Sequence, residues 1–174
     1  QDYFSDALEK IRAELRITTP PSAENQDWLD RIAADEGAIS VHLRRGDYVD
    51  VKKGNATHGT CDEGYYRAAL AQITERNAVN PRAYVFSDDP GWARAHLDLG
   101  VETVVLGHNG PMQHYEDLRL MAACRHHVIA NSTFSWWGAW LNASPTKSVV
   151  APKRWFATEK IVNPDILPAG WIRA

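Results

Sequence analysis

Cysteine is nearly absent from this chain of 174 residues, which contains only Cys61 and Cys124. Two cysteines cannot build the disulfide framework of a small secreted domain, and a reducing compartment is the simpler interpretation. No apolar run approaches the ~20 residues that a membrane-spanning helix needs. The first residues also lack the basic and apolar segments of a signal peptide. We therefore expect no membrane-spanning segment in this chain.

An excess of positive charge is also lacking, because 19 Lys and Arg face 22 Asp and Glu and the formal net charge is −3. This balance excludes the broad basic surface of a general nucleic-acid-binding protein, so any anion site must be local. Hydrophobic residues make up 44% and charged residues 24% of the chain, which is typical of a globular protein with a real core. We expect no nucleic-acid partner.

Short apolar runs that alternate with helical patterns indicate the fold class. Continuous apolar runs are typical of parallel strands buried on both faces, and their alternation with helices indicates βαβ units. The sequence therefore predicts an α/β fold, a Rossmann-like parallel sheet with flanking helices. Ligands of such sheets bind beyond the carboxyl ends of the strands, so polar residues that follow a strand are the candidate site residues. The expected strands cover 38–43, 83–86, 102–106, 127–130 and 148–151, and the expected helices 3–16, 24–35, 62–77, 90–97, 114–124 and 135–143.

The first polar segment follows the first expected strand and reads His42-Leu43-Arg44-Arg45-Gly46-Asp47-Tyr48. Alternation along a strand sends His42 and Arg44 to the same side. The guanidinium of Arg44 is a planar fork of donors that matches phosphate oxygens. Asp47 could pair with one of the two arginines. The alternatives are a surface cluster of ion pairs or a cell-adhesion tripeptide at 45–47, a match too short to be specific.

The second polar segment follows the next expected strand and reads Phe86-Ser87-Asp88-Asp89-Pro90. Ser or Asp at this place can cap a helix that has Pro90 in its first turn, which explains one of the two carboxylates. The other could accept the paired N–H donors of a guanine base. A divalent metal held by Asp88 and Asp89 is a weaker alternative, since no third carboxylate is close in sequence.

The third polar segment, Asn131-Ser132-Thr133-Phe134-Ser135, leads from a strand straight into a helix rich in tryptophan. Free N–H groups and a partial positive charge make such a helix start a ready site for anions. Hydroxyl groups of Ser132, Thr133 and Ser135 could add hydrogen bonds. The alternative is simple capping of the helix by one hydroxyl. For the tryptophans that follow, packing is favoured over stacking on a ligand.

Two weaker candidates complete the survey. Cys124, His126 and His127 lack the paired spacing of a zinc site, so we interpret them as a helix end that runs into a strand and predict no metal site. Asp117 lies in the helix expected over 114–124, where it either orients the loops at the sheet end or faces solvent.

At these residues the sequence resembles a known family. The segment from His42 to Tyr48 is similar to the H-x-R-R-x-D motif of α-1,2- and α-1,6-fucosyltransferases and protein O-fucosyltransferases. The segments 86–89 and 131–141 resemble the later motifs of the α-1,2-fucosyltransferases, glycosyltransferase family 11. The resemblance runs from about Ile39 to Phe156, and the third motif is its most specific part.

The resemblance implies the donor-binding half of a GT-B-like glycosyltransferase that uses GDP-β-L-fucose without a metal or other cofactor. It implies inversion at the anomeric carbon and an α-1,2 link to a galactose-containing glycan acceptor. Residues 1–37 would then be a helical remnant of the N-terminal acceptor region, and 38–174 the GDP-fucose-binding domain. The expected location is the bacterial cytoplasm, with or without association with a membrane. The alternatives are a truncated nucleotide-sugar-binding domain without transferase activity, or a transferase that uses another GDP-sugar.

The resemblance also assigns roles to residues. Arg44 would bind the β-phosphate, His42 would help to place the nucleotide, and Asp88 or Asp89 would contact guanine. The diphosphate or fucose would meet Thr133, Phe134 and Ser135. The catalytic candidates are Arg44 and Asp47, the latter as a base unless it pairs with an arginine. The complete expected GDP-fucose site consists of His42, Arg44, Arg45, Ser87, Asp88, Asp89, Asn131, Ser132, Thr133, Phe134 and Ser135.

Overall fold

A single parallel sheet organises the protein, as a computed structural model shows for residues 6–45, 61–156, 158, 161 and 164–174. Its strand order is β3-β2-β1-β4-β5-β6, and every neighbouring pair is parallel. This is the order of the dinucleotide-binding Rossmann fold, so the predicted fold class is confirmed. The strands are β1 (Ala38–Leu43), β2 (Arg82–Ser87), β3 (Glu102–Leu106), β4 (His126–Val128), β5 (Val149–Ala151) and β6 (Ile172–Arg173).

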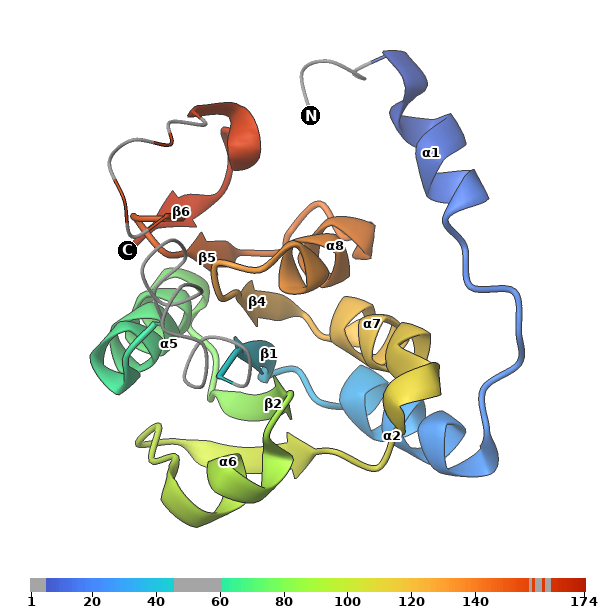
Figure 1. Cartoon of the computed structure of the whole chain (residues 1–174), viewed down its shortest axis with the longest axis horizontal. Coiled ribbons are helices and arrows are strands. Elements are labelled where there is room, and N and C mark those ends of the chain that lie inside the picture. Colours follow the sequence, from blue (N-terminus) through green and yellow to red (C-terminus); the bar gives the residue numbers. More distant parts are fainter. Residues whose placement is uncertain (1–5, 46–60, 157, 159–160, 162–163) are drawn as a thin grey trace.

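Helices cover both faces of the sheet (Figure 1). Helices α5 and α6 pack on one face, and α2, α7 and α8 pack on the other. Helix α1 lies at the margin of this three-layer body, at the end of an extended segment. The α-helices are α1 (Leu8–Glu14), α2 (Ala23–Ala34), α5 (Glu63–Asn77), α6 (Pro90–His96), α7 (His114–Ala123) and α8 (Thr133–Leu141), and the 3-10 helices are η2 (Pro111–Gln113) and η3 (Pro164–Ile166). No helix in the described part of the chain is long and apolar enough to cross a bilayer.

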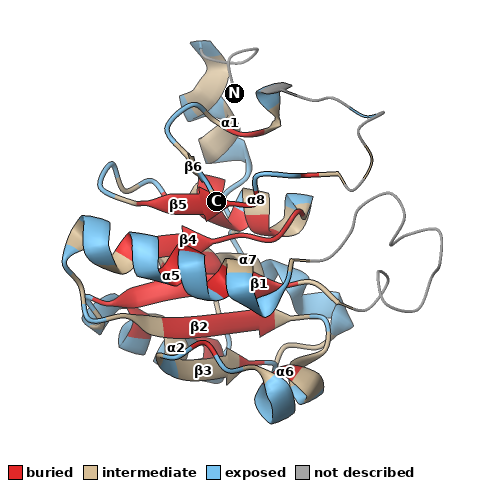
Figure 2. Cartoon of the chain, turned by 90° about the vertical axis from the view of Figure 1, so that its left-hand side faces the viewer, coloured by how far each residue is buried: buried red, intermediate tan, exposed pale blue. Residues whose placement is uncertain are grey.

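The side chains of β1 alternate between the two helical layers. All six of its residues are buried, and Figure 2 shows the sheet as the buried centre of the molecule. Ile39, Val41 and Leu43 belong to the core shared with α5. The residues between them, which include Ser40 and His42, therefore face the layer of α2, α7 and α8.

The point where the strand order reverses lies between β1 and β4. From β1 the chain builds outward through β2 to β3, and then α7 returns it to β4 on the other side of β1. In sheets of this kind the crevice at the carboxyl ends of those two strands is the ligand site. The first and third polar segments of the sequence follow β1 and β4, so the topology brings them to the same crevice.

Some elements differ from the sequence-based expectation. Helix α8 begins at Thr133 rather than at residue 135, because Ser132 has extended backbone angles and forms the N-cap. The short strand β6 was not predicted. Helix α2 packs with α7 and the sheet through Ile32, although the sequence assigned it to an N-terminal remnant ending at residue 37. That domain boundary stays a prediction.

Candidate functional site

A cavity of about 320 Å³ opens at the carboxyl ends of β1 and β2, beside the starts of α7 and α8. Parallel register aligns His42 with Phe86 and Leu43 with Ser87 at this edge of the sheet. The wall combines cationic, carboxylate, imidazole and apolar groups, which is the chemistry that a nucleotide requires. The lining residues are His42, Arg44, Phe86, Ser87, Asp88, Pro90, Asn109, Pro111, His114, Asp117 and Phe134.

His42 sits in the floor of this cavity and is 4% exposed. Burial lowers its pKa to about 4, with Asp88 acting to raise the pKa and Arg44 to lower it. The imidazole is therefore neutral at neutral pH. Its Nδ1 is buried and has no hydrogen-bond partner among the described residues, and its ring lies 5.5 Å from that of Phe134. His42 thus has a polar atom left for a ligand.

Arg44 lines the cavity and is held by Asp88. Its Nε lies 3.2 Å from Asp88 Oδ2, and the two side chains are 29% and 21% exposed. The other oxygen of Asp88 accepts a hydrogen bond of 2.9 Å from the backbone N–H of Arg45. One carboxylate therefore ties the end of β1 to the end of β2 and fixes Arg44 through Nε.

Arg45 lies on the opposite side of the sheet, as alternation along β1 requires. Its guanidinium stacks over the ring of Trp92, 3.4 Å from the ring centre. There it lines a smaller cavity of about 180 Å³, together with Leu43 and Cys61. The predicted shared side for His42 and Arg44 is confirmed, whereas the structure does not bring the Arg45 side chain to the larger cavity.

The carboxylates that follow β2 have different tasks. Asp89 is the N-cap of α6, because its side chain accepts a hydrogen bond of 3.0 Å from the N–H of Trp92. Ser87 accepts a hydrogen bond from the N–H of Asp89. The predicted capping of this helix is confirmed. Asp89 is thus engaged in the cap, and Asp88, which lines the cavity, is engaged with Arg44. Contact of either carboxylate with guanine stays a prediction.

Only Phe134 of the third polar segment lines the cavity. The buried hydroxyl of Ser135 donates back to the carbonyl oxygens of Ala130 and Ser132, at 3.4 and 3.2 Å. Asn131 is also buried and donates to the carbonyl oxygen of Trp155. Ser132 is the N-cap without a side-chain cap bond, and Thr133 is exposed. The cavity therefore receives the first turn of α8 through Phe134, and the polar side chains of the segment do not line it.

Trp136 and Trp140 of α8 pack, as expected, whereas Trp137 is exposed. Trp140 is 4% exposed, and Trp136 packs against Trp171 with ring centres 5.5 Å apart. The indole N–H of Trp136 donates to the carbonyl oxygen of Ile166. These contacts fix the start of α8 against the C-terminal part of the chain.

Six lining residues were not among the predicted site residues. Phe86 and Pro90 belong to the second polar segment, whereas Asn109 and Pro111 lie on the connection from β3 to α7, and His114 and Asp117 lie in α7 itself. Burial raises the pKa of Asp117, while a hydrogen bond from Asn109 acts to lower it. The one available signal was the place of Asp117 in the first turns of a helix that follows a strand. The predicted base Asp47 lies outside the described residues. In the described part of the chain no three His, Cys, Asp or Glu side chains are grouped so as to hold a metal ion.

Comparison with known proteins gives a consistent result. The family model of glycosyl transferase family 11 matches residues 24–174. The alpha-1,2-colitosyltransferase of Escherichia coli is 33% identical over 98% of this chain and 58% of its own length. The O-antigen biosynthesis glycosyltransferase WbnK of Escherichia coli is 36% identical over 89% of this chain and 54% of its own length. A third relative is galactoside alpha-(1,2)-fucosyltransferase 1 of Saimiri sciureus, 27% identical over 83% of this chain and 41% of its own length.

The chain thus spans about half the length of the curated relatives that it matches. Among solved structures, POFUT1 in complex with GDP aligns with 74% of this chain and 46% of its own chain. Sequence identity in that alignment is 12% and the TM-score is 0.47.

Proposed function

Because the chain belongs to glycosyl transferase family 11, we propose that it is the part of an α-1,2-fucosyltransferase that binds GDP-β-L-fucose. One observation carries the proposal: Arg44, at the end of β1, and Phe134, in the first turn of α8, line the same cavity at the reversal point of the sheet. A fixed guanidinium beside a helix start is a pair of groups suited to a diphosphate.

The diphosphate would lie between Arg44 and the start of α8. Asp88 engages Nε of Arg44, and a guanidinium carries further N–H donors on its two terminal nitrogens, in a geometry that matches phosphate oxygens. The first N–H groups of α8 have no partner within the helix and carry its partial positive charge. These backbone donors are the ones that the sequence predicted for an anion, without the added hydroxyl groups.

The same arrangement supports metal-independent chemistry. When GDP departs, negative charge grows on the β-phosphate while the sugar becomes oxocarbenium-like. Donors that are already in place stabilise this charge most in the transition state, and they can thereby take the role of a divalent cation. Direct attack of an acceptor 2-hydroxyl on the opposite face of fucose would invert the anomeric carbon. We keep Asp47 as the candidate base for that hydroxyl.

The guanine base of the nucleotide would lie against the connection from β3 to α7. Phe86, Pro90 and Pro111 supply apolar wall, and Asp117 supplies a carboxylate. An ionised carboxylate can accept the N1–H and 2-amino hydrogens of guanine together. We therefore assign guanine to Asp117 in place of Asp88 or Asp89, which are engaged with Arg44 and with the cap of α6.

A second donor deserves a test because a relative at 33% identity is named an alpha-1,2-colitosyltransferase. Colitose lacks the 3-hydroxyl group of fucose, so the two nucleotide sugars differ by one hydroxyl group. Thermal-shift titration with GDP-fucose, GDP-colitose, GDP-mannose and UDP-galactose would rank them, since a ligand of the native state raises the melting temperature according to its affinity. Stronger stabilisation by UDP-galactose than by the GDP-sugars would contradict the proposal.

Calorimetric titration of GDP into the Arg44→Ala variant tests the site directly. Loss of a charge-assisted contact should weaken GDP binding by about tenfold or more, while the fold survives because Arg44 is partly exposed. The matched control is Arg76→Ala, which removes an exposed arginine from the last turn of α5. Unchanged affinity in Arg44→Ala would refute the role of Arg44.

Transfer is tested separately, since the chain spans only about half of its relatives. Radiolabelled fucose should pass from GDP-fucose to lactose at a rate that EDTA does not change. If GDP-fucose binds but no label is transferred, the chain is a binding domain and the enzyme proposal is wrong. Loss of transfer in EDTA would contradict metal independence.

A further inference from the structure

Asn25, the third residue of α2, is 1% exposed, and every donor and acceptor position of its side-chain amide is occupied by a hydrogen bond. Its Nδ2 donates to Ser22 Oγ at 3.1 Å and to Asn109 Oδ1 at 2.9 Å. Its Oδ1 accepts from His108 Nε2 at 2.8 Å and from Asn109 Nδ2 at 3.3 Å. A side-chain amide offers two donors and two acceptor lone pairs. The Asn25 amide is therefore saturated and held in one orientation.

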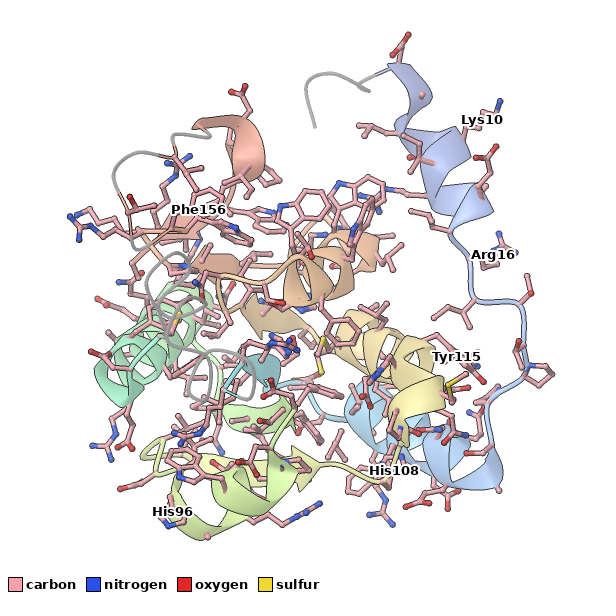
Figure 3. The ribbon with its side chains drawn as sticks, in the orientation of Figure 1. Lys10, Arg16, His96, His108, Tyr115 and Phe156 are labelled. Carbon is pink, nitrogen blue, oxygen red and sulfur yellow. The ribbon has the colours of Figure 1, made fainter. Side chains whose placement is uncertain are left out.

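The contact of Asn25 with His108 indicates which nitrogen of the imidazole carries the proton. The Oδ1 of Asn25 can only accept, so Nε2 of His108 must carry the proton. Figure 3 shows His108 beside α2, where its ring stacks on Trp28 at a centroid distance of 6.5 Å. An ionised carboxylate can only accept, so Asp117 requires the Nδ2 of Asn109 to face it, and this requirement sets the orientation of both amides.

Asn109 connects the Asn25 amide to the cavity. Asn109 Oδ1 accepts from Asn25 Nδ2, and Asn109 Nδ2 donates back to Asn25 Oδ1. That nitrogen donates to Asp117 Oδ1 at 2.8 Å. Both Asn109 and Asp117 line the large cavity. The chain of contacts therefore runs from the buried Asn25, in the first turn of α2, to a carboxylate at the candidate site.

We propose that Asn25 is a positioning residue that sets the Asp117 carboxylate for recognition of a guanine base; this inference rests on the proposed function. Asn109 occupies one carboxylate oxygen, and the second has no hydrogen-bond partner among the described residues. With its plane fixed, the carboxylate presents itself to the N1–H and 2-amino group of guanine. Asn25 touches no nucleotide and acts only through Asn109.

A purely structural role explains the network less well. Packing α2 against α7 could be achieved by apolar side chains, as it is at Ile32 and Leu120 in the same layer. Buried polar networks gain little net stability over such packing, but a fully satisfied one fixes a single geometry. A saturated amide that holds Asn109 against one cavity carboxylate therefore indicates control of the orientation of that carboxylate.

The test compares GDP with IDP, which lacks the 2-amino group and differs in no other way. We expect the unaltered chain to bind GDP about tenfold or more tightly than IDP in calorimetric titrations, because one charge-assisted hydrogen bond separates them. Asn25→Ala should reduce this preference to about threefold or less, mainly by weakening GDP binding. Gln26→Ala, on the exposed side of α2 where Gln26 contacts Asp30, is the control that should keep the full preference.

Asn109→Ala provides a second variant, because Asn109 is only partly buried and its loss is less disruptive to the fold. It should also lower the GDP-to-IDP ratio, with a cooperative thermal unfolding transition as proof of folding. A full ratio in either folded variant would overturn the inference while leaving the proposed function intact. Equal affinity of the unaltered chain for GDP and IDP would overturn the base contact and the inference together. No binding of GDP at all would instead refute the proposed function.

Discussion

Arg44 and Asp88 face each other across the ends of β1 and β2, with Nε and Oδ2 separated by 3.2 Å. The pair is partly exposed, so its net contribution to stability is small, about 0–1 kcal/mol. Its effect on binding differs, because the carboxylate holds the guanidinium at the cavity before any ligand arrives. The pair therefore illustrates preorganisation of a diphosphate site.

Asp88→Asn should separate these two effects. The side chain keeps its shape but loses its charge, so binding of GDP must then order Arg44. Ordering one flexible side chain costs about 0.5–1.5 kcal/mol, so we expect a roughly two- to tenfold loss of GDP affinity by calorimetry. The urea midpoint should change little. Asp98→Asn, which breaks the exposed pair with Arg67, is the control, and a rise in affinity in Asp88→Asn would contradict this account.

Close contact between α7 and α8 gives a second prediction. A Cβ at Gly138 would lie 2.8 Å from Met121 Sδ and 3.0 Å from Met121 Cβ. Gly138→Ala should therefore push α8 from α7 and cost about 1–3 kcal/mol by overpacking, less the higher helix propensity of alanine. Urea denaturation measures the loss of stability. Because α8 begins at the cavity, GDP affinity should fall in the folded variant, and affinity equal to that of the unaltered chain would show that the helix start is not part of the site.

Sequence patterns predicted the sheet well because parallel strands buried on both faces are continuous apolar runs. The exception was β6, because a strand of two residues, Ile172 and Arg173, is too short to show a pattern of hydrophobicity. The facing of Arg44 was predictable as well, since strand alternation is local geometry. Its partner was not, because Asp88 lies 44 residues away and only the β1–β2 register brings it near.

The sequence could not predict which residues at the start of α8 line the cavity. Successive helical residues turn by about 100°, so adjacent polar residues cannot all face one cavity. Ser135 and Asn131 find partners in Ala130 and Trp155, contacts that depend on tertiary packing. Asp117 was undervalued for the same reason, because the approach of Asn109 from the preceding connection gives it its place in the site.

Acid should destabilise the protein through His127. This residue is fully buried, and its pKa is lowered to about 3 chiefly by burial. Asn142 Nδ2 can only donate, so His127 Nε2 accepts, and Nδ1–H donates to Ser40 Oγ at 2.7 Å. A proton on Nε2 would face that amide donor. The neutral ring is therefore required for this network.

The direction of the pH effect follows from linkage. In the unfolded chain His127 takes up a proton below pH 6.5, whereas in the folded chain it does so only near pH 3. The contribution of His127 to stability is therefore complete above pH 6.5 and falls by about 1.4 kcal/mol per pH unit between these values, or by about 2 kcal/mol at pH 5. Urea denaturation at pH 7 and pH 5 checks this loss. His127→Gln should be less stable at pH 7 but show a shallower dependence on pH, and an unchanged slope would assign the effect to other groups.

Asp117→Asn tests the base contact without disturbing the diphosphate groups. The amide cannot accept two hydrogen bonds as an ionised carboxylate does, and its NH₂ group would oppose the donors of guanine. GDP affinity should fall by about tenfold or more, while IDP binding falls less and the preference for GDP is lost. Calorimetric titration with both nucleotides measures the two constants. In the unaltered chain the preference should also weaken on acidification at a higher pH than an ordinary aspartate would require, because burial raises the pKa of Asp117. A variant that retains its full preference for GDP would contradict the role of Asp117 and would assign the guanine contact to Asp88 or another group.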